Sequence, residues 1–178
     1  MKYLRRGTGW LAGILLITAI LIGLVIVTFN EAMNLTNIQI VLKGGMAYRA
    51  QALMGISDGS ERSTFFTDDA TYGDDAEDIR QRYEAYNIRG INHNLDTGFA
   101  WIWPQWGRQT EAQTVTIEVT ESIPSIDGRA RGSRAEELVQ EGGADAVYPP
   151  KWITTRYRVT LERDTATRTW RIKKIERN

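Results

Sequence analysis

The chain contains one histidine, and imidazole is the side chain that most often moves protons near neutral pH. His93 stands in the segment NIRGINHNLD, with Asp96 three residues after it. Such a histidine could act as a general base, but a lone histidine in a polar strand or turn is more often structural. No nucleophile or second base accompanies it at a recognisable spacing, so we predict no catalytic residue.

Metal and thiol chemistry are limited by composition. The chain has no cysteine, which excludes disulfides, thiolate metal sites and cysteine nucleophiles. A single histidine also excludes any metal site that needs two imidazoles. We expect no cofactor.

Six acidic residues lie close together in the middle of the chain and raise the question of calcium. The ordered ligand spacing of a calcium-binding loop, with its central glycine and final glutamate, is absent. We therefore predict a solvated face and a helix start capped by Asp74 or Asp75. The six residues, none of which we assign to a metal, are Asp68, Asp69, Asp74, Asp75, Glu77 and Asp78.

The segment FAWIWPQWGR, residues 99–108, places Trp101, Trp103 and Trp106 within six positions. In a strand the first two tryptophans would share a face, and Pro104 should end the strand or lie at an edge. One interpretation is that this face closes the core. The other is an exposed aromatic loop that docks on a partner or lies in the membrane interface, where tryptophan is enriched. We keep the three tryptophans as candidate partner-binding residues.

An uncharged run from Trp10 to Phe29 is the element that must position everything else. A helix of this length is about 30 Å long, the thickness of the hydrocarbon core of a bilayer. We predict a transmembrane helix over residues 10–29. Within it Ala19 and Gly23 form a small-xxx-small pair of the kind that lets membrane helices approach closely, so both are candidate partner-binding residues.

Basic residues predict the orientation of this helix. Lys2, Arg5 and Arg6 precede the run, and the first basic residue after it is Lys43. By the positive-inside rule the amino terminus should stay in the cytoplasm and the rest of the chain should be extracytoplasmic. A cleaved signal peptide is the alternative, but the run is long and no small-residue cleavage pattern follows it. We expect a retained anchor and a single-pass protein of the cell membrane.

The overall net charge of zero conceals an asymmetry. Three of the 22 basic residues precede the run, whereas all 22 acidic residues follow it, so the part after the run has a net charge of −3. Nucleic-acid binding requires a concentrated basic face. We expect the lipid bilayer and other subunits of a membrane complex as partners, and no nucleic acid.

Helical periodicity continues after the membrane run. Apolar residues spaced by three, four or seven define one face of a helix over residues 30–54. Gly44 and Gly45 interrupt it, since an interior glycine costs up to about 1 kcal/mol relative to alanine. They indicate either a kink or the close packing of another element. The apolar face consists of Leu35, Ile38, Val41 or Leu42, Met46 and Leu53. A second helix is predicted over residues 74–86, with Ile79, Tyr83 and Tyr86 on one face.

Strand patterns dominate the second half. Residues 87–95 can begin a strand, and residues 114–121 alternate with Val115, Ile117 and Val119 on one face. Residues 153–162 and 170–173 also alternate, and residues 164–168 predict a tight hairpin between them. The inward residues of this pair are Ile153, Tyr157, Val159, Leu161, Trp170 and Ile172, whereas Glu118 and Glu162 should face outward.

Residues 125–148 are charged and rich in glycine, and we expect a mobile insertion there with a short helix over residues 133–141. Helices followed by antiparallel strands predict an α+β domain, a curved sheet packed on helices. The chain then divides into cytoplasmic residues 1–9, the transmembrane helix 10–29, a juxtamembrane first helix 30–54 and the remaining extracytoplasmic domain 55–178.

The segment RYRVTLERDTATRTWRIKKIE, Arg156 to Glu176, resembles the final hairpin of nuclear-transport-factor-2-like proteins, which have a cone-shaped α+β fold. Membrane-anchored members of this kind use the cone as an assembly module. Enzymes of the family, such as ketosteroid isomerase, carry an acid inside the cone and a tyrosine facing it. No acid–tyrosine motif of this chain matches theirs, so the resemblance assigns no catalytic residue here.

Three functions follow as expectations. The first is a non-enzymatic single-span protein whose extracytoplasmic domain serves as an accessory or assembly subunit of a membrane complex. The second is a tethered binder of a small apolar ligand, which requires an open pocket lined by Trp101, Tyr157 and Trp170. The third is an isomerase-like enzyme, which requires a buried acid near a tyrosine.

Overall fold

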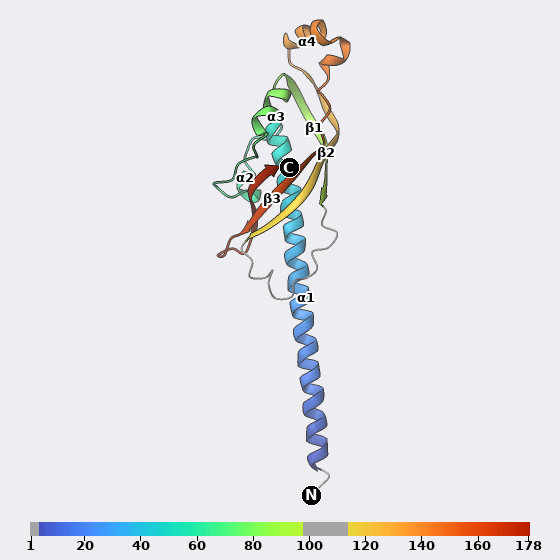
Figure 1. Cartoon of the computed structure of the whole chain (residues 1–178), viewed down its shortest axis with the longest axis vertical. Coiled ribbons are helices and arrows are strands. Elements are labelled where there is room, and N and C mark those ends of the chain that lie inside the picture. Colours follow the sequence, from blue (N-terminus) through green and yellow to red (C-terminus); the bar gives the residue numbers. More distant parts are fainter. Residues whose placement is uncertain (1–3, 98–113) are drawn as a thin grey trace.

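The fold is known from a computed structural model that describes the backbone of residues 4–97 and 114–178. The chain is an α+β protein, as the sequence predicts: one long helix is followed by short helices and a four-stranded antiparallel sheet. In Figure 1 the strands lie across the upper half of the long helix, and its lower half extends alone.

Helix α1 runs without a break from Leu4 to Leu53, and its 50 residues give a length of about 75 Å. Residues 14–29 are all exposed, whereas burial begins at Ile38. Among the described residues, α1 is the one helix long and apolar enough to cross a membrane. The predicted membrane helix and the predicted first helix of the domain are therefore two parts of one continuous helix (Figure 1).

The predicted apolar face of the upper half of α1 is confirmed. Ile38, Leu42, Met46 and Leu53 are buried against the rest of the domain. They recur at intervals of four, four and seven residues, so they line one side of the helix.

The glycine pair in α1 marks close packing and not a kink. A Cβ atom on Gly44 would lie 2.5 Å from Cε1 of Phe65, and one on Gly45 would lie 2.4 Å from Cδ1 of Ile172. Phe65 ends the short helix α2, Arg62–Phe65, and Ile172 belongs to the last strand. Glycine is required here because two other elements touch the helix backbone.

The sheet has the strand order β1-β2-β3-β4, with every neighbour antiparallel. Helix α3, Ala76–Tyr83, precedes it and confirms a second helix with Ile79 and Tyr83 buried, but the helix is shorter than the predicted 74–86, and the placement of Tyr86 on it is wrong because Tyr86 begins β1. The hairpin between the last two strands is also confirmed. The strands are β1 Tyr86–Thr97, β2 Thr114–Ala130, β3 Thr155–Arg163 and β4 Trp170–Arg177.

The prediction of a mobile insertion over residues 125–148 is wrong in its first part. Strand β2 continues to Ala130, which pairs with Tyr86 of β1. Pro124 does not stop it, because the pairing shifts register between Asn92 and Asn94 and leaves the proline outside the ladder. The predicted short helix is confirmed as α4, Arg134–Gly142, and a 3₁₀ turn, Ala144–Val147, follows it.

The core consists of two apolar clusters along the upper half of α1. One gathers Tyr157, Val159 and Leu161 of β3 with Trp170 and Ile172 of β4. The other gathers residues of α3 and the paired ends of β1 and β2. The outward positions of Glu118 and Glu162 are confirmed, with Glu118 well exposed and Glu162 partly so.

One inward assignment, that of Ile153, is wrong. Its side chain is 53% exposed, because β3 begins only at Thr155 and the strand alternation does not extend back to it.

The two edges of the sheet differ. The outer edge of β4 is partly covered, since Phe66 forms a parallel bridge with Ile172 and the backbone N–H of Thr67 donates to the Ile172 carbonyl at 3.0 Å. No strand pairs with the outer edge of β1 in the part of the chain that the structure describes. Strand β1 is interrupted by two register shifts, a feature that protects exposed edges from indiscriminate pairing.

Candidate functional site

A buried arginine lies at the centre of the domain. Arg49 is on the packed face of α1 and has no exposed surface. A guanidinium is always charged and is almost never fully buried without partners. Its Nε donates to the Tyr72 carbonyl at 2.5 Å, its Nη1 lies 3.2 Å from Glu121 Oε2, and its Nη2 forms an ion pair with Asp75. The flat face of the guanidinium lies over the ring of Tyr157, and its Cζ is 4.7 Å from the ring centre.

Asp75 reaches this arginine from the start of α3. It occupies the N-cap position of that helix, but its side chain makes no capping hydrogen bond. Of the two predicted capping residues, Asp74 and Asp75, the second is therefore wrong as a side-chain cap. One oxygen of Asp75 pairs with Arg49, and the other accepts a hydrogen bond from the Tyr157 hydroxyl. A buried guanidinium is the stronger partner of a carboxylate, because it carries a full positive charge, whereas a helix amide is neutral.

Glu121 and His93 complete the cluster from β2 and β1. Glu121 is fully buried and follows Val115, Ile117 and Val119 at the same two-residue interval, so it lies on the inward face of its strand. His93 stands at a register shift of β1, and its Nε2 lies 2.9 Å from Glu121 Oε1. The histidine thus has a partner in the core, in line with its structural interpretation.

Opposite charges lie close together in the cluster. Arg49 lies between two carboxylates, Asp75 and Glu121, and His93 contacts the second of them. Burial raises the pKa of the Tyr157 phenol; the nearby Arg49 lowers it by less, and the hydrogen bond to Asp75 raises it again. Tyr157 therefore remains a neutral donor at neutral pH.

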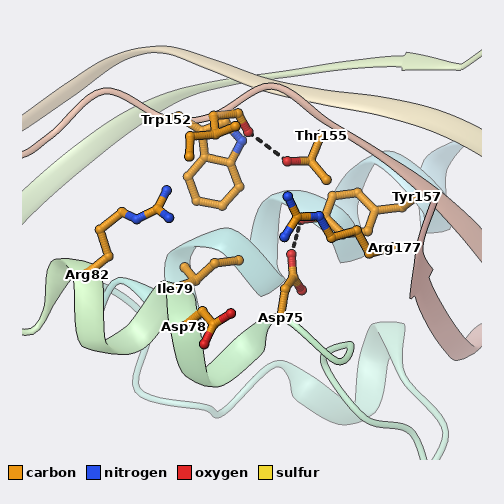
Figure 2. A pocket seen from close by; sticks show the side chains of 9 residues that line it. Asp75, Asp78, Ile79, Arg82, Trp152, Thr155, Tyr157 and Arg177 are labelled. Atoms are coloured by element: carbon orange, nitrogen blue, oxygen red, sulfur yellow. Dashed lines mark hydrogen bonds between the residues drawn. The ribbon is translucent and has the colours of Figure 1, made fainter.

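A small pocket beside Asp75 and Tyr157 connects the cluster with the surface (Figure 2). Its volume is about 40 Å³, which is room for about one water molecule. Asp78, Arg82, Trp152 and Arg177 also line it, and four of its nine lining residues are charged. The pocket is too small for an organic ligand.

The arrangement holds elements together more readily than it binds a substrate. Both oxygens of Asp75 and all three nitrogens of the Arg49 guanidinium have partners within the cluster. These contacts tie α1 to the start of α3, to β2 and to β3. A satisfied buried network of this kind fixes one arrangement of its elements.

The sequence-predicted site residues do not meet in this cluster. Trp101, Trp103 and Trp106 lie outside the described residues. Ala19 and Gly23 are exposed on the lower half of α1, and nothing lies within 4 Å of a Cβ built on Gly23. Within residues 13–29, 33–97 and 114–178, no three acidic or histidine side chains gather to hold a metal ion. Five of the six clustered acids are exposed, and only Asp75 is buried.

Sequence reasoning missed Arg49, Glu121 and Tyr157 as members of one site. Two signals were present. Arg49 follows Met46 by three residues and precedes Leu53 by four, so it falls on the apolar face of its helix. Glu121 continues the inward alternation of β2. A charged residue at a position that periodicity assigns to the core indicates a buried ion pair.

One further sequence pattern lies in the turn after α1. Residues 55–59 read GISDG, which matches the Gly-x-Ser-x-Gly sequence of serine hydrolases, where the serine stands between a strand and a helix. Here the segment follows the end of α1, and Ser57 Oγ accepts a hydrogen bond from the Gly59 amide at 3.3 Å. The one histidine of the chain is engaged with Glu121. The segment is a turn that ends the helix.

No family model matches the chain, and no curated protein or solved structure is significantly similar to it.

Proposed function

We propose that the protein is a non-enzymatic, single-span membrane protein whose extracytoplasmic domain acts through protein–protein contacts as an accessory or assembly subunit of a membrane complex. The observation that carries this proposal is the continuity of α1, which joins the apolar span directly to the core of the domain. Trp170 Nε1 also donates to Asn34 Oδ1 at 2.6 Å, five residues beyond the span. The domain is thereby held close to the bilayer in one orientation, which suits a scaffold.

A line of exposed residues on α1 provides the contact surface in this proposal. Ala19 and Gly23 lie in the span, and Met33 and Ile40 lie beyond it, 49% and 60% exposed. At 100° per residue the four fall within about 100° of arc, so they form one stripe along the helix. Small residues allow another helix to approach within the membrane, and the two apolar side chains would be covered by the same partner. We name these four residues the helix stripe.

The orientation of the protein is part of the proposal. Lys2, Arg5 and Arg6 precede the span, which supports a cytoplasmic amino terminus in the cell membrane and an extracytoplasmic domain. The kinship with nuclear-transport-factor-2-like assembly modules is proposed on the antiparallel sheet packed on a helix and on the hairpin of β3 and β4.

The alternatives receive less support from the structure. An apolar-ligand binder requires Trp101, Tyr157 and Trp170 to line an open pocket. Trp101 lies outside the described residues, the other two are buried in the core, and the pocket at Tyr157 holds about 40 Å³. An isomerase requires a buried acid beside a tyrosine, and Asp75 with Tyr157 supplies that pair. However, the carboxylate of Asp75 already forms an ion pair with Arg49, and the pocket leaves no room for an organic substrate.

Purification of the tagged full-length chain from its native membrane in mild detergents tests the proposal. We expect it to co-purify with other membrane subunits in a complex of fixed composition. Replacing residues 10–29 with an unrelated apolar helix should reduce that assembly beyond the effect of tethering. A lone monomer in every mild detergent, or full assembly after the replacement, would contradict the proposed role of the span.

A further inference from the structure

A groove of about 740 Å³ lies on the sheet away from the Arg49 cluster, where β1 begins and β2 ends. It is lined by Asn87, Arg89 and residues 127–132. Arg129 pairs in register with Asn87 and is exposed, whereas the next pair, Gly128 with Ile88, is buried. Strand alternation therefore places Arg129 on the outer face of the sheet. We name this feature the arginine groove.

The arginine groove has an excess of positive charge. Three arginines, Arg89, Arg129 and Arg131, line it together with one acid, Asp127. None of the three arginines forms an ion pair within the described part of the chain. Like charges held together without matching acids repel one another, so an anion that enters the groove gains their combined attraction.

The three arginines are not equally available. Arg131 Nε donates to the Tyr86 carbonyl at 3.1 Å, which anchors that side chain in place. Arg129 lies over the ring of Tyr148 at 5.7 Å, and Arg89 is exposed. Arg89 and Arg129 therefore present the guanidinium groups that are free to bind a ligand.

Anionic lipids of the anchoring bilayer cannot reach this groove. Arg131 lies beside the loop after α1, since its Nη2 is 3.9 Å from the position of a Cβ on Gly55. The helix between Phe29 and Leu53 is about 36 Å long at 1.5 Å per residue. That distance is several times the Debye length of about 8 Å at physiological salt, so headgroup charges are screened.

The spacing of the arginines indicates an extended ligand. Arg129 of β2 is in register with Asn87 of β1, and Arg89 stands two residues farther along β1, which corresponds to about 7 Å along a strand. An extended peptide with acidic residues at every second position has the same repeat. Guanidinium groups bind carboxylates through paired hydrogen bonds, and the outer edge of β1 beside the groove pairs with no strand among the described residues.

From this geometry we infer that the arginine groove binds an extended acidic segment of a partner protein. The inference rests on the proposed function, because it specifies the chemistry of the partner in the assembly. It places that partner at the end of the domain far from the membrane, whereas the helix stripe acts within and just above the bilayer.

Binding of defined peptides to the full-length chain tests the inference. The chain would be placed in nanodiscs of zwitterionic lipid, and fluorescence anisotropy would follow a labelled peptide of alternating Glu and Thr. A matched peptide with Gln for Glu is the control ligand. We expect saturable binding of the Glu peptide that weakens with added salt, and at least about tenfold weaker binding of the Gln peptide.

Two variants localise the binding. Arg89→Gln with Arg129→Gln should weaken binding of the Glu peptide about tenfold or more, because both available guanidinium groups are lost. Arg156→Gln changes an exposed arginine of β3 outside the groove and should have no effect. Arg131 is left in place because it bonds to the Tyr86 carbonyl. Circular dichroism would verify that the variants are folded.

Four outcomes would overturn the inference: no binding of the Glu peptide, equal binding of the Gln peptide, unchanged binding by the double variant, or binding of heparin alone, which would indicate an anionic polysaccharide. Self-association measured on the same nanodisc samples reports on the helix stripe. A failure of the groove is therefore distinguishable from a failure of the proposed assembly role.

Discussion

Glycine has opposite surroundings in the two halves of α1. In the lower half nothing lies within 4 Å of a Cβ built on Gly13 or Gly23. In the upper half a Cβ on Gly44 or Gly45 would collide with Phe65 or Ile172. Glycine in the upper half thus serves contacts made within the chain, whereas glycine in the lower half leaves space that only another molecule can fill.

Polar groups follow the same division. Thr18 and Thr28 in the lower half donate their hydroxyls to carbonyls one turn earlier, at Ile14 and Leu24. A segment surrounded by lipid must satisfy its polar groups internally. Arg49 in the upper half instead bonds to a loop carbonyl, to Asp75 and to Glu121. The described polar side chains of the lower half thus bond within the helix, whereas Arg49 in the upper half bonds to residues from the rest of the fold.

The largest loss of stability is expected for substitution of Arg49, the side chain of α1 that bonds to the most other elements. Arg49→Met should cost about 3–5 kcal/mol of unfolding free energy, because Asp75 and Glu121 would remain buried without their cation. Thermal unfolding of the full-length chain in detergent measures this. Arg80→Met removes an exposed pair with Glu77 and should change stability by less than about 1 kcal/mol. Similar losses in both variants would show that the buried cluster does not hold the domain together.

Gly45→Leu should destabilise the domain by about 1–3 kcal/mol, since the side chain would be forced against Ile172 and Phe65 in a packed core. The lower half offers the matched control, Gly13→Leu, which should leave the unfolding temperature unchanged. If both variants unfold at the same temperature as the unmodified chain, the close contact at Gly45 is not a constraint.

Tyr157→Phe should cost about 1 kcal/mol at neutral pH, because one oxygen of Asp75 loses its donor. The raised pKa of Tyr157 also predicts a pH dependence. A folded-state pKa above the unfolded value gives stability that is present below the unfolded pKa of about 10 and is lost as the pH rises beyond it. Unfolding temperatures measured from neutral to alkaline pH should fall less steeply for the phenylalanine variant. If the unfolding temperatures of the two proteins fell equally with pH, the loss of stability at alkaline pH would not come from Tyr157.

The smallest effect on stability is expected for Gly23→Leu, because no described residue lies within 4 Å of a Cβ at that position. Its effect should appear in association instead. We expect weaker helix–helix contact in the membrane, measured by cross-linking or energy transfer between labelled chains, as the side chain blocks close approach. Gly13→Leu lies about 120° from Ala19 around the helix, off the helix stripe, and should leave association intact. Equal behaviour of the two variants would remove Gly23 from the contact surface.

Periodic patterns predicted most of the fold. The four-residue spacing of Ile38, Leu42 and Met46 predicted the buried face of α1, and two-residue alternation predicted β3 and β4. Predictions failed where local chemistry misled, as in the continuation of β2 past Pro124. A proline normally ends a strand, and only the register shift of the neighbouring β1 removes the need for its missing N–H.

The sequence alone determined the apolar length of α1, the faces of its upper half and the existence of the hairpin, because each depends on residues close in the chain. It also contained both signals for a buried charge, Arg49 and Glu121, but it did not show that they are partners. Arg49 stands 26 residues from Asp75 and 72 from Glu121, and Tyr157 stands 82 from Asp75. Tertiary structure alone decided these pairings, since a buried charge takes whichever opposite charge the packing of distant elements brings within reach.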